Sequence, residues 1–162
     1  MTRERLKFLL TFNEETGRFF WRGGVKRGCR EGALAGTYDV KYPLIRIDGY
    51  FYKLHHLVWL WKTGAWPIEF VDHRDLKTKN SVPSNLRAAT HSQNNANRRC
   101  RPNATGLKGV IRIRAAKMNK FGACISVNGR NRSLGRFKTA EDAHAAYRIA
   151  ATERFGEFAR FE

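Results

Sequence analysis

The order of apolar and polar residues in the first part of the chain predicts short elements of mixed type. Apolar residues with helical spacing follow Thr2 and stop at the turn-forming stretch 13–17. Alternation around Asp48-Gly49 is typical of a β-hairpin, and the apolar run after it is typical of a buried helix. The expected elements are a helix and turn within 2–20, a strand at 19–21, a glycine-rich loop over 23–36, a hairpin over 42–52 and a helix over 54–62.

The last part of the chain predicts a three-stranded antiparallel sheet covered by one helix. Strand-like segments occupy 109–114, 121–127 and 130–137, and Asn128-Gly129 between the last two is a strong signal for a two-residue hairpin turn. Thr139 can cap a following helix whose narrow apolar face consists mostly of alanines. Together with the N-terminal elements, this pattern predicts the α+β fold class.

A basic, proline-containing segment at 98–103 suggests where one domain ends. We therefore expect a first domain over 1–99 with its core at about 39–99, a linker over 100–105 and a second domain over 106–162.

Charge adds the strongest bulk signal. The chain has 31 Lys and Arg against 14 Asp and Glu, a formal net charge of +17. No acidic residue occurs from Leu76 to Ala140, whereas Lys and Arg are frequent there. A solvated, solubilising surface does not require such exclusion of acid, so the pattern favours a nucleic-acid partner. No apolar run reaches the roughly 20 residues that span a bilayer, no signal peptide opens the chain, and the three cysteines form no CxxC pair. We expect no membrane partner, no secretion, and a cytoplasmic location in a bacterial or phage-infected cell.

Asp72-His73 follows a short segment with apolar residues and is itself followed by many asparagines. Cleavage of a phosphodiester needs a base for the attacking water, which a neutral imidazole provides near pH 7. It also needs a cation near the leaving oxygen, and a hard divalent ion is held by carboxylate and amide oxygens. The opposing interpretation is a polar loop with an incidental histidine. The asparagines concerned are Asn80, Asn85, Asn94, Asn95 and Asn97.

These residues resemble the HNH endonuclease family, in the variant found in phage and intron-associated homing enzymes. The matching motif is Asp72-His73, then Asn85-Leu86, then Asn94. The resemblance implies a ββα-metal core of strand, long loop, strand and helix. It implies that His73 is the general base, that Asp72 and Asn94 hold one divalent metal, Mg²⁺ or Mn²⁺, and that Asn85 braces the loop and orients His73.

Two flanking segments extend the resemblance. His55-His56-Leu57-Val58-Trp59 is similar to the family's H-R-L-V-W helix, with His56 in place of the arginine. On this apolar helix a structural histidine is at least as frequent as a ligand. Asp75 and Asn80 match the loop pattern, but Leu76 or Lys77 stands where the family usually has glycine.

The stretch 106–162 resembles the plant APETALA/ERF DNA-binding domain, which also occurs in phage and bacterial HNH enzymes. Gly109-Val110, Asn128-Gly129 and Thr139-Ala140-Glu141 are among the matching residues. The resemblance implies that the sheet lies in the major groove of DNA, and the strand register decides which face each arginine takes. The expected DNA-binding residues are Arg87, Arg98, Arg99, Arg101, Lys108, Arg112, Arg114, Lys117, Lys120, Arg130 and Arg132.

We therefore expect a metal-dependent HNH endonuclease that cuts double-stranded DNA, of the homing type and phage-encoded. The chain would act as a monomer that nicks or as a homodimer that cuts both strands. The first alternative is a DNA-binding regulator with an inactive nuclease centre, which would keep its function when His73 is replaced by Ala. The second is a structural nucleoid-type or RNA-binding protein, although RNA readers usually carry paired aromatics on an exposed sheet face.

Overall fold

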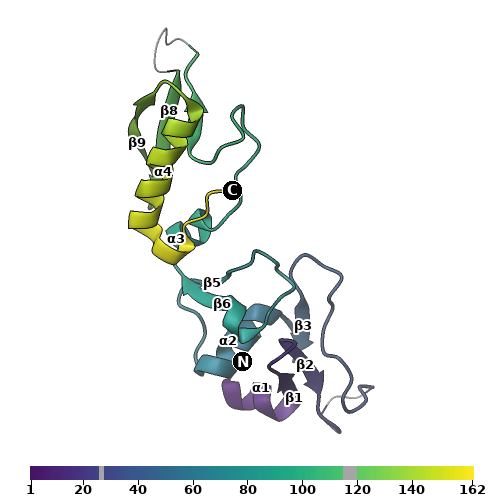
Figure 1. Ribbon diagram of the computed structural model, residues 1–162. Coiled ribbons are helices and arrows are strands. Elements are labelled where there is room, and N and C mark those ends of the chain that lie inside the picture. Colours follow the sequence, from purple (N-terminus) through teal and green to yellow (C-terminus); the bar gives the residue numbers. More distant parts are fainter. Residues whose placement is uncertain (26–27, 115–119) are drawn as a thin grey trace. The chain divides into compact units, whose positions relative to one another are not determined.

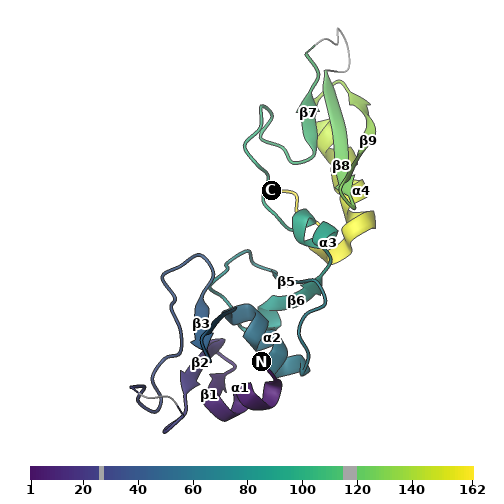
Figure 2. The same cartoon turned by 180° about the vertical axis from the view of Figure 1, so that it is seen from behind.

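The computed structural model describes residues 1–25, 28–114 and 120–162 (Figures 1 and 2). Short sheets and four α-helices make up this part of the chain, so the expected α+β class is confirmed. The chain forms two compact units, Met1–Ala88 and Ala89–Glu162. The boundary between them lies N-terminal to the expected linker at 100–105, and the assignment of functional domains to 1–99 and 106–162 stays a prediction.

The first unit opens with helix α1 (Arg3–Leu9), which passes directly into strand β1 (Leu10–Asn13). The expectation that Leu10 continues the helix is wrong, because β1 pairs antiparallel with β2 (Arg18–Trp21) and sets Leu10 opposite Trp21. Thr2 caps α1 by accepting a hydrogen bond from the Arg5 backbone nitrogen. Leu10 is fully buried, so the turn from helix to strand keeps the apolar side chains of both elements in one core.

A second hairpin and a buried helix complete the core of this unit. Strand β3 (Leu44–Ile47) pairs antiparallel with β4 (Tyr50–Lys53) around Asp48-Gly49, as the alternation predicts. Helix α2 (Leu54–Thr63) follows without a break and ends at Gly64, which adopts the left-handed conformation. The core cluster draws on all these elements and includes Leu6, Phe19, Ile45, Ile47, Leu54, Leu57 and Leu60.

The next elements carry the Asp-His pair. Strand β5 (Phe70–His73) forms a two-stranded sheet with β6 (Leu86–Ala89), and a short 3₁₀ helix, η1 (Pro83–Asn85), leads into β6. The loop before η1 lies against the β1–β2 turn. A Cβ on Gly17 would come within 2.4 Å of the Ser81 carbonyl carbon. Glycine is therefore required where these two backbones approach each other.

The second unit is a sheet covered on one face by a long helix. Strands β7 (Val110–Arg112), β8 (Phe121–Val127) and β9 (Arg130–Phe137) form an antiparallel sheet in that order. Asn128 and Gly129 form the expected two-residue hairpin turn, and their positive φ angles are those of a type I′ turn. Helix α4 (Ala140–Phe155) begins at the Thr139 cap, lies across the sheet (Figures 1 and 2) and continues into η2 (Gly156–Phe158).

Helix α3 (His91–Ala96) packs within the second unit. Thr90 and Gln93 form a capping box at its start. Ala96 belongs to the same buried cluster as Ile125 and Tyr147. Beyond the helix, the Cys100 backbone nitrogen donates to the Glu162 carbonyl oxygen over 2.9 Å. These contacts explain why the segment after Ala88 folds with the C-terminal sheet.

Candidate active site

Asp72 and His73 are both buried at the end of β5, with 4% and 6% of their surface exposed. Asp72 Oδ2 accepts a hydrogen bond of 2.9 Å from Nε of Arg87, which lies on β6 and is itself buried. Burial of a carboxylate is costly unless a cation and hydrogen bonds compensate for its lost hydration. The paired strand supplies that cation, so Arg87 fixes the position of the Asp72 carboxylate.

The imidazole of His73 belongs to a cluster of three histidines. Its ring centroid lies 4.9 Å from that of His55 in an edge-to-face arrangement, and His55 lies 4.5 Å from His56. Burial lowers the pKa of His73 below its ordinary value, and the charges of Asp75 and Asp72 act in the opposite direction. His73 is therefore neutral at pH 7, the protonation state that a general base requires.

His55 and His56 come from α2, which forms one wall of the cluster. Burial, together with the charges of His56, His73 and Lys53, lowers the pKa of His55 to about 3. Its Nδ1 is buried and has no hydrogen-bond partner in the described part of the chain. Burial also lowers the pKa of His56. The neutral ring of His55 therefore lies against His73 without adding positive charge beside it.

The loop after His73 is held by hydrogen bonds among three polar residues. The Asn85 amide donates to Asp75 Oδ1 over 2.9 Å and to the Asn80 carbonyl over 2.8 Å, and its Oδ1 accepts from the Asp75 backbone nitrogen. The Asn80 amide donates to Asp75 Oδ2 over 2.7 Å. In addition, the Arg74 backbone nitrogen donates to the Asn85 carbonyl. Asn85 thus ties both ends of the loop together directly beside His73.

Leu76 occupies the loop position where glycine was expected. Its φ is +62°, a left-handed conformation that costs a non-glycine residue about 1–2 kcal/mol. The loop therefore keeps a glycine-type backbone despite the leucine. The surrounding hydrogen bonds compensate for the strain, which is typical of loops that position functional groups.

The predicted metal ligands lie in different units. Asp72 belongs to the first unit, whereas Asn94 is half-buried on α3 in the second, so their pairing stays a prediction. No group of three or more His, Cys, Asp or Glu that could hold a metal is present in residues 1–25, 28–114 and 120–162. A site of one carboxylate, one amide and waters needs no such group, and the oxygen of Asp72, fixed by Arg87, is of the type that Mg²⁺ prefers.

The structure gives partners within the protein to two residues expected to bind DNA. Arg87 is buried in its ion pair with Asp72, so it cannot lie on a phosphate-binding surface. The Lys108 ammonium donates over 2.6 Å to the carbonyl oxygens of both Ala96 and Arg98, at the end of α3. Burial lowers the pKa of Lys108 to about 8. Arg87 therefore has a structural role in place of the expected contact, whereas Lys108 is half-buried and its contact with DNA stays a prediction. The ion pair between Arg87 and Asp72 was not predicted from the sequence. The signal for it is that a buried carboxylate on one strand needs a cation from a neighbouring element, and the paired strand carries Arg87.

The register of the C-terminal sheet decides which way its arginines point. Arg112 is paired with Phe121, Arg132 with Ile125 and Arg130 with Val127. Cross-strand partners share a face, and the face with Ile125 and Val127 packs on α4. The side chains of these three arginines are exposed, but they lie on the face of the sheet that packs on α4. The opposite face carries Ile111, Cys124, Ser126, Asn131, Ser133 and, as a cation that the sequence analysis missed, Arg136.

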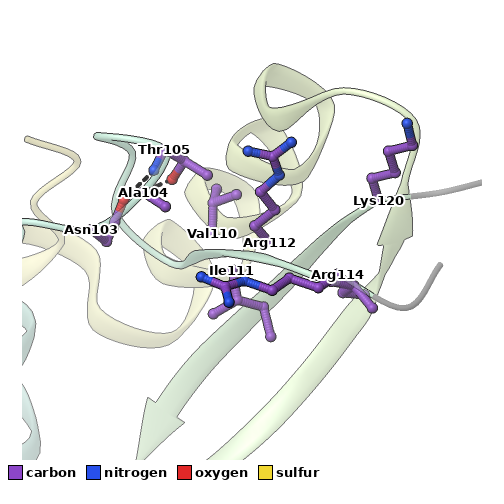
Figure 3. Close-up of a pocket in the computed structure, with 9 residues that line it drawn as sticks. Asn103, Ala104, Thr105, Val110, Ile111, Arg112, Arg114 and Lys120 are labelled. Atoms are coloured by element: carbon purple, nitrogen blue, oxygen red, sulfur yellow. Dashed lines mark hydrogen bonds between the residues drawn. The ribbon is translucent and has the colours of Figure 1, made fainter.

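An open groove of about 820 Å³ runs beside β7, between this strand and the loop before it (Figure 3). Its lining includes Arg112, Arg114 and Lys120 and no acidic residue. None of the three has an ion-pair partner among the described residues, and each is exposed. The groove is therefore suited to a polyanion.

The other expected DNA-binding residues are on the surface or cannot be placed. Arg98, Arg99 and Arg101 are exposed in the segment that follows α3. Lys117 lies outside the described residues.

Within the described ranges, no helix is long and apolar enough to cross a membrane.

Comparison with known proteins gives a match in the segment that contains the histidine cluster. The model of the HNH endonuclease family matches residues 52–96, from β4 through α3. A relative, an uncharacterized HNH endonuclease of Acanthamoeba polyphaga mimivirus, is 33% identical over 124 residues. The alignment covers 75% of this chain and 60% of that relative. No solved structure matches. Residues 52–96, which hold the Asp72-His73 pair, the braced loop and α3, are thus the part of the chain that is similar to the HNH endonuclease family.

Proposed function

We propose that this protein is a metal-dependent endonuclease that hydrolyses phosphodiester bonds of double-stranded DNA. The observation that carries the proposal is His73, a buried histidine kept neutral beside the Arg87-fixed carboxylate of Asp72, inside the HNH-matching segment. The absence of acidic residues from Leu76 to Ala140 supports a polyanionic substrate.

In this proposal His73 accepts a proton from water as the water oxygen bonds to phosphorus. The bond from phosphorus to the 3′-oxygen breaks, and that oxygen takes up a proton from solvent as it leaves, so the products carry 5′-phosphate and 3′-hydroxyl ends. Asn85 keeps the loop beside His73 in place through its bonds to Asp75 and Asn80. Asp72 and Asn94 would hold one Mg²⁺ or Mn²⁺ ion, whose charge would offset negative charge that develops on the phosphate.

For the second unit, we propose that its basic surface holds the duplex. Arg112, Arg114 and Lys120 line an acid-free groove, and Arg98, Arg99 and Arg101 are exposed nearby in sequence. The likeness of 106–162 to APETALA/ERF domains supports DNA as the ligand. The outer sheet face is mostly small and polar, which favours contacts to phosphate over the base readout of the plant proteins. A homing-type enzyme encoded by a phage is the context that agrees with both resemblances.

The test uses supercoiled plasmid and purified protein with Mg²⁺ or Mn²⁺. We expect nicked or linear DNA that disappears with EDTA and with His73→Ala, while His73→Ala still shifts DNA in a gel. His91→Ala is the matched control, because His91 is an exposed histidine at the start of α3. Nicked product alone would indicate a monomer acting on one strand.

The regulator remains the second candidate. Its support is the missing loop glycine, since Leu76 stands where the family usually has that residue. Binding without cleavage across both metals, unchanged by His73→Ala, would establish the regulator and reject the endonuclease.

A further inference from the structure

The β3–β4 hairpin of the first unit presents cations and aromatic rings on its outer face. In the antiparallel register Arg46 lies opposite Phe51 and Leu44 lies opposite Lys53, so these side chains share one face. The alternate face is the buried one and carries Ile45 and Ile47. On the outer face, Phe51 leaves 66% of its surface exposed. An exposed phenylalanine of this extent on a small domain calls for an explanation.

Each ring on this surface has a cation over it. The Arg46 guanidinium carbon lies 5.6 Å from the centroid of the Phe51 ring. The Lys53 ammonium lies 5.4 Å, and the Lys41 ammonium 5.7 Å, from the centroid of the Tyr42 ring. We call these five residues, Lys41, Tyr42, Arg46, Lys53 and Phe51, the hairpin patch.

The hairpin patch keeps its positive charge. The one acidic residue between Leu44 and Lys53 is Asp48 in the turn. Both of its carboxylate oxygens accept hydrogen bonds from Arg5, at 3.0 and 3.1 Å. Asp48 is therefore neutralised by a residue outside the patch, and Arg46 and Lys53 are left to attract an external anion.

The patch is connected to the histidine cluster through ring contacts. The Tyr42 ring centroid lies 5.7 Å from that of His55, and His55 lies 4.9 Å from His73. Lys53 is also the residue that precedes α2, on which His55 stands. The hairpin patch and His73 therefore lie on either side of the His55 ring, two ring contacts apart.

We propose that the hairpin patch binds the sugar-phosphate backbone of the DNA substrate next to the phosphate that is cut, an inference that rests on the proposed function. Arg46 and Lys53 contact phosphates, and Phe51 packs against a sugar or a base. A second copy of this chain is the poorer occupant. In a two-fold symmetric contact the same cations would oppose each other.

The inference is tested by the salt dependence of DNA binding. The full chain and the double variant Arg46→Gln/Lys53→Gln are titrated with fluorescent duplex in EDTA over a range of salt. Each phosphate contact contributes a slope of about 0.9 in the logarithmic plot of affinity against salt. We expect the double variant to lose about 1.8 of that slope and Phe51→Ala to weaken binding with the slope unchanged. The control is Lys7→Gln/Lys62→Gln, which removes the same amount of charge from positions outside the patch. Lys62 is paired with Glu14.

The outcomes separate the inference from the proposed function. A double variant that is folded by circular dichroism but keeps the wild-type slope overturns the inference, as does an equal loss in the control. Sedimentation showing that Phe51→Ala converts a dimer to a monomer would identify a second copy as the occupant and also overturn it. Loss of slope in the double variant, together with no cleavage by the wild type, would support the patch and reject the nuclease.

Discussion

Arg87 on β6 donates to the Asp72 carboxylate on β5 across 2.9 Å, and both side chains are almost completely buried. One residue of the Asp-His motif is thus fixed by a cation from the neighbouring strand before any metal binds. In the proposed endonuclease, a carboxylate held in this way would keep the same position when substrate binds, so little reorganisation would remain for the reaction.

Removal of Arg87 should destabilise the first unit. Arg87→Met leaves the Asp72 carboxylate buried without this partner, and breaking a buried pair from one side typically costs about 3–5 kcal/mol. The free energy of unfolding in urea measures the effect. Adding Asp72→Asn to Arg87→Met should recover part of the loss, because no charge is then buried. A double variant as unstable as the sum of the two single variants would show that the pair is not coupled.

Leu76→Gly should raise the free energy of unfolding by about 0.5–1 kcal/mol. The left-handed backbone costs leucine about 1–2 kcal/mol, and the greater freedom of glycine in the unfolded chain offsets part of the gain. Chemical denaturation measures the difference. Lys77→Gly is the matched control, since Lys77 does not have positive φ and glycine there should destabilise. Equal destabilisation by both changes would contradict the interpretation of strain at Leu76.

The buried histidines should make the first unit sensitive to acid. His55 has a folded pKa of about 3 against 6.5 for an unperturbed histidine. Between these values the unfolded chain binds a proton that the folded chain does not, so stability falls as pH decreases from 6.5. Unfolding free energies measured from pH 7 to pH 4 should decline less steeply in His55→Leu than in the wild type. His91→Leu, which changes an exposed histidine, should keep the wild-type decline.

Gly109→Ala should disrupt the second unit. A Cβ at this position would lie 2.1 Å from Cδ2 of Tyr147, and φ is +78°. The ring is buried against the sheet and cannot move away, so we expect a loss above about 3 kcal/mol. Gly106→Ala is the control, because its φ is also positive but no atom lies within 4 Å of the added Cβ. Thermal unfolding that is alike in the two variants would argue against close packing of Gly109 on α4.

The local elements could be predicted from the sequence where turn and cap residues have a strong conformational preference. The Asn128-Gly129 and Asp48-Gly49 hairpins and the Thr139 cap follow from the conformations that these residues prefer. The motif also led to the histidine and loop residues of the HNH-matching segment. The β1 strand was missed because Leu10 satisfies helical spacing as well as strand alternation, and pairing with β2 decides between them.

Long-range geometry accounts for the remaining differences. Whether an arginine faces DNA, a helix or a buried carboxylate depends on strand register, which a single sequence does not specify. Arg87 is buried in an ion pair with Asp72, and the half-buried Lys108 ammonium donates to two backbone carbonyl oxygens, although both residues read as basic surface in the sequence. Arg136 lies on the outer face of the sheet because it pairs with Gly122. The register of β8 and β9 then shifts at a β-bulge between Ala123 and Cys124.

The packing of α3 limits where domains of such proteins can be exchanged by recombination. The helix carries Asn94, yet it is built into the same core as Ile125 and Tyr147, and Lys108 donates a hydrogen bond to the carbonyl oxygen of its last residue, Ala96. Exchange of the C-terminal sheet between relatives at the proline-containing segment 98–103 would leave α3 without that core. Recombination within β6, between Ala88 and Ala89, would instead transfer the helix together with the sheet. The sheet domain and a residue of the nuclease motif are therefore expected to be inherited as one module.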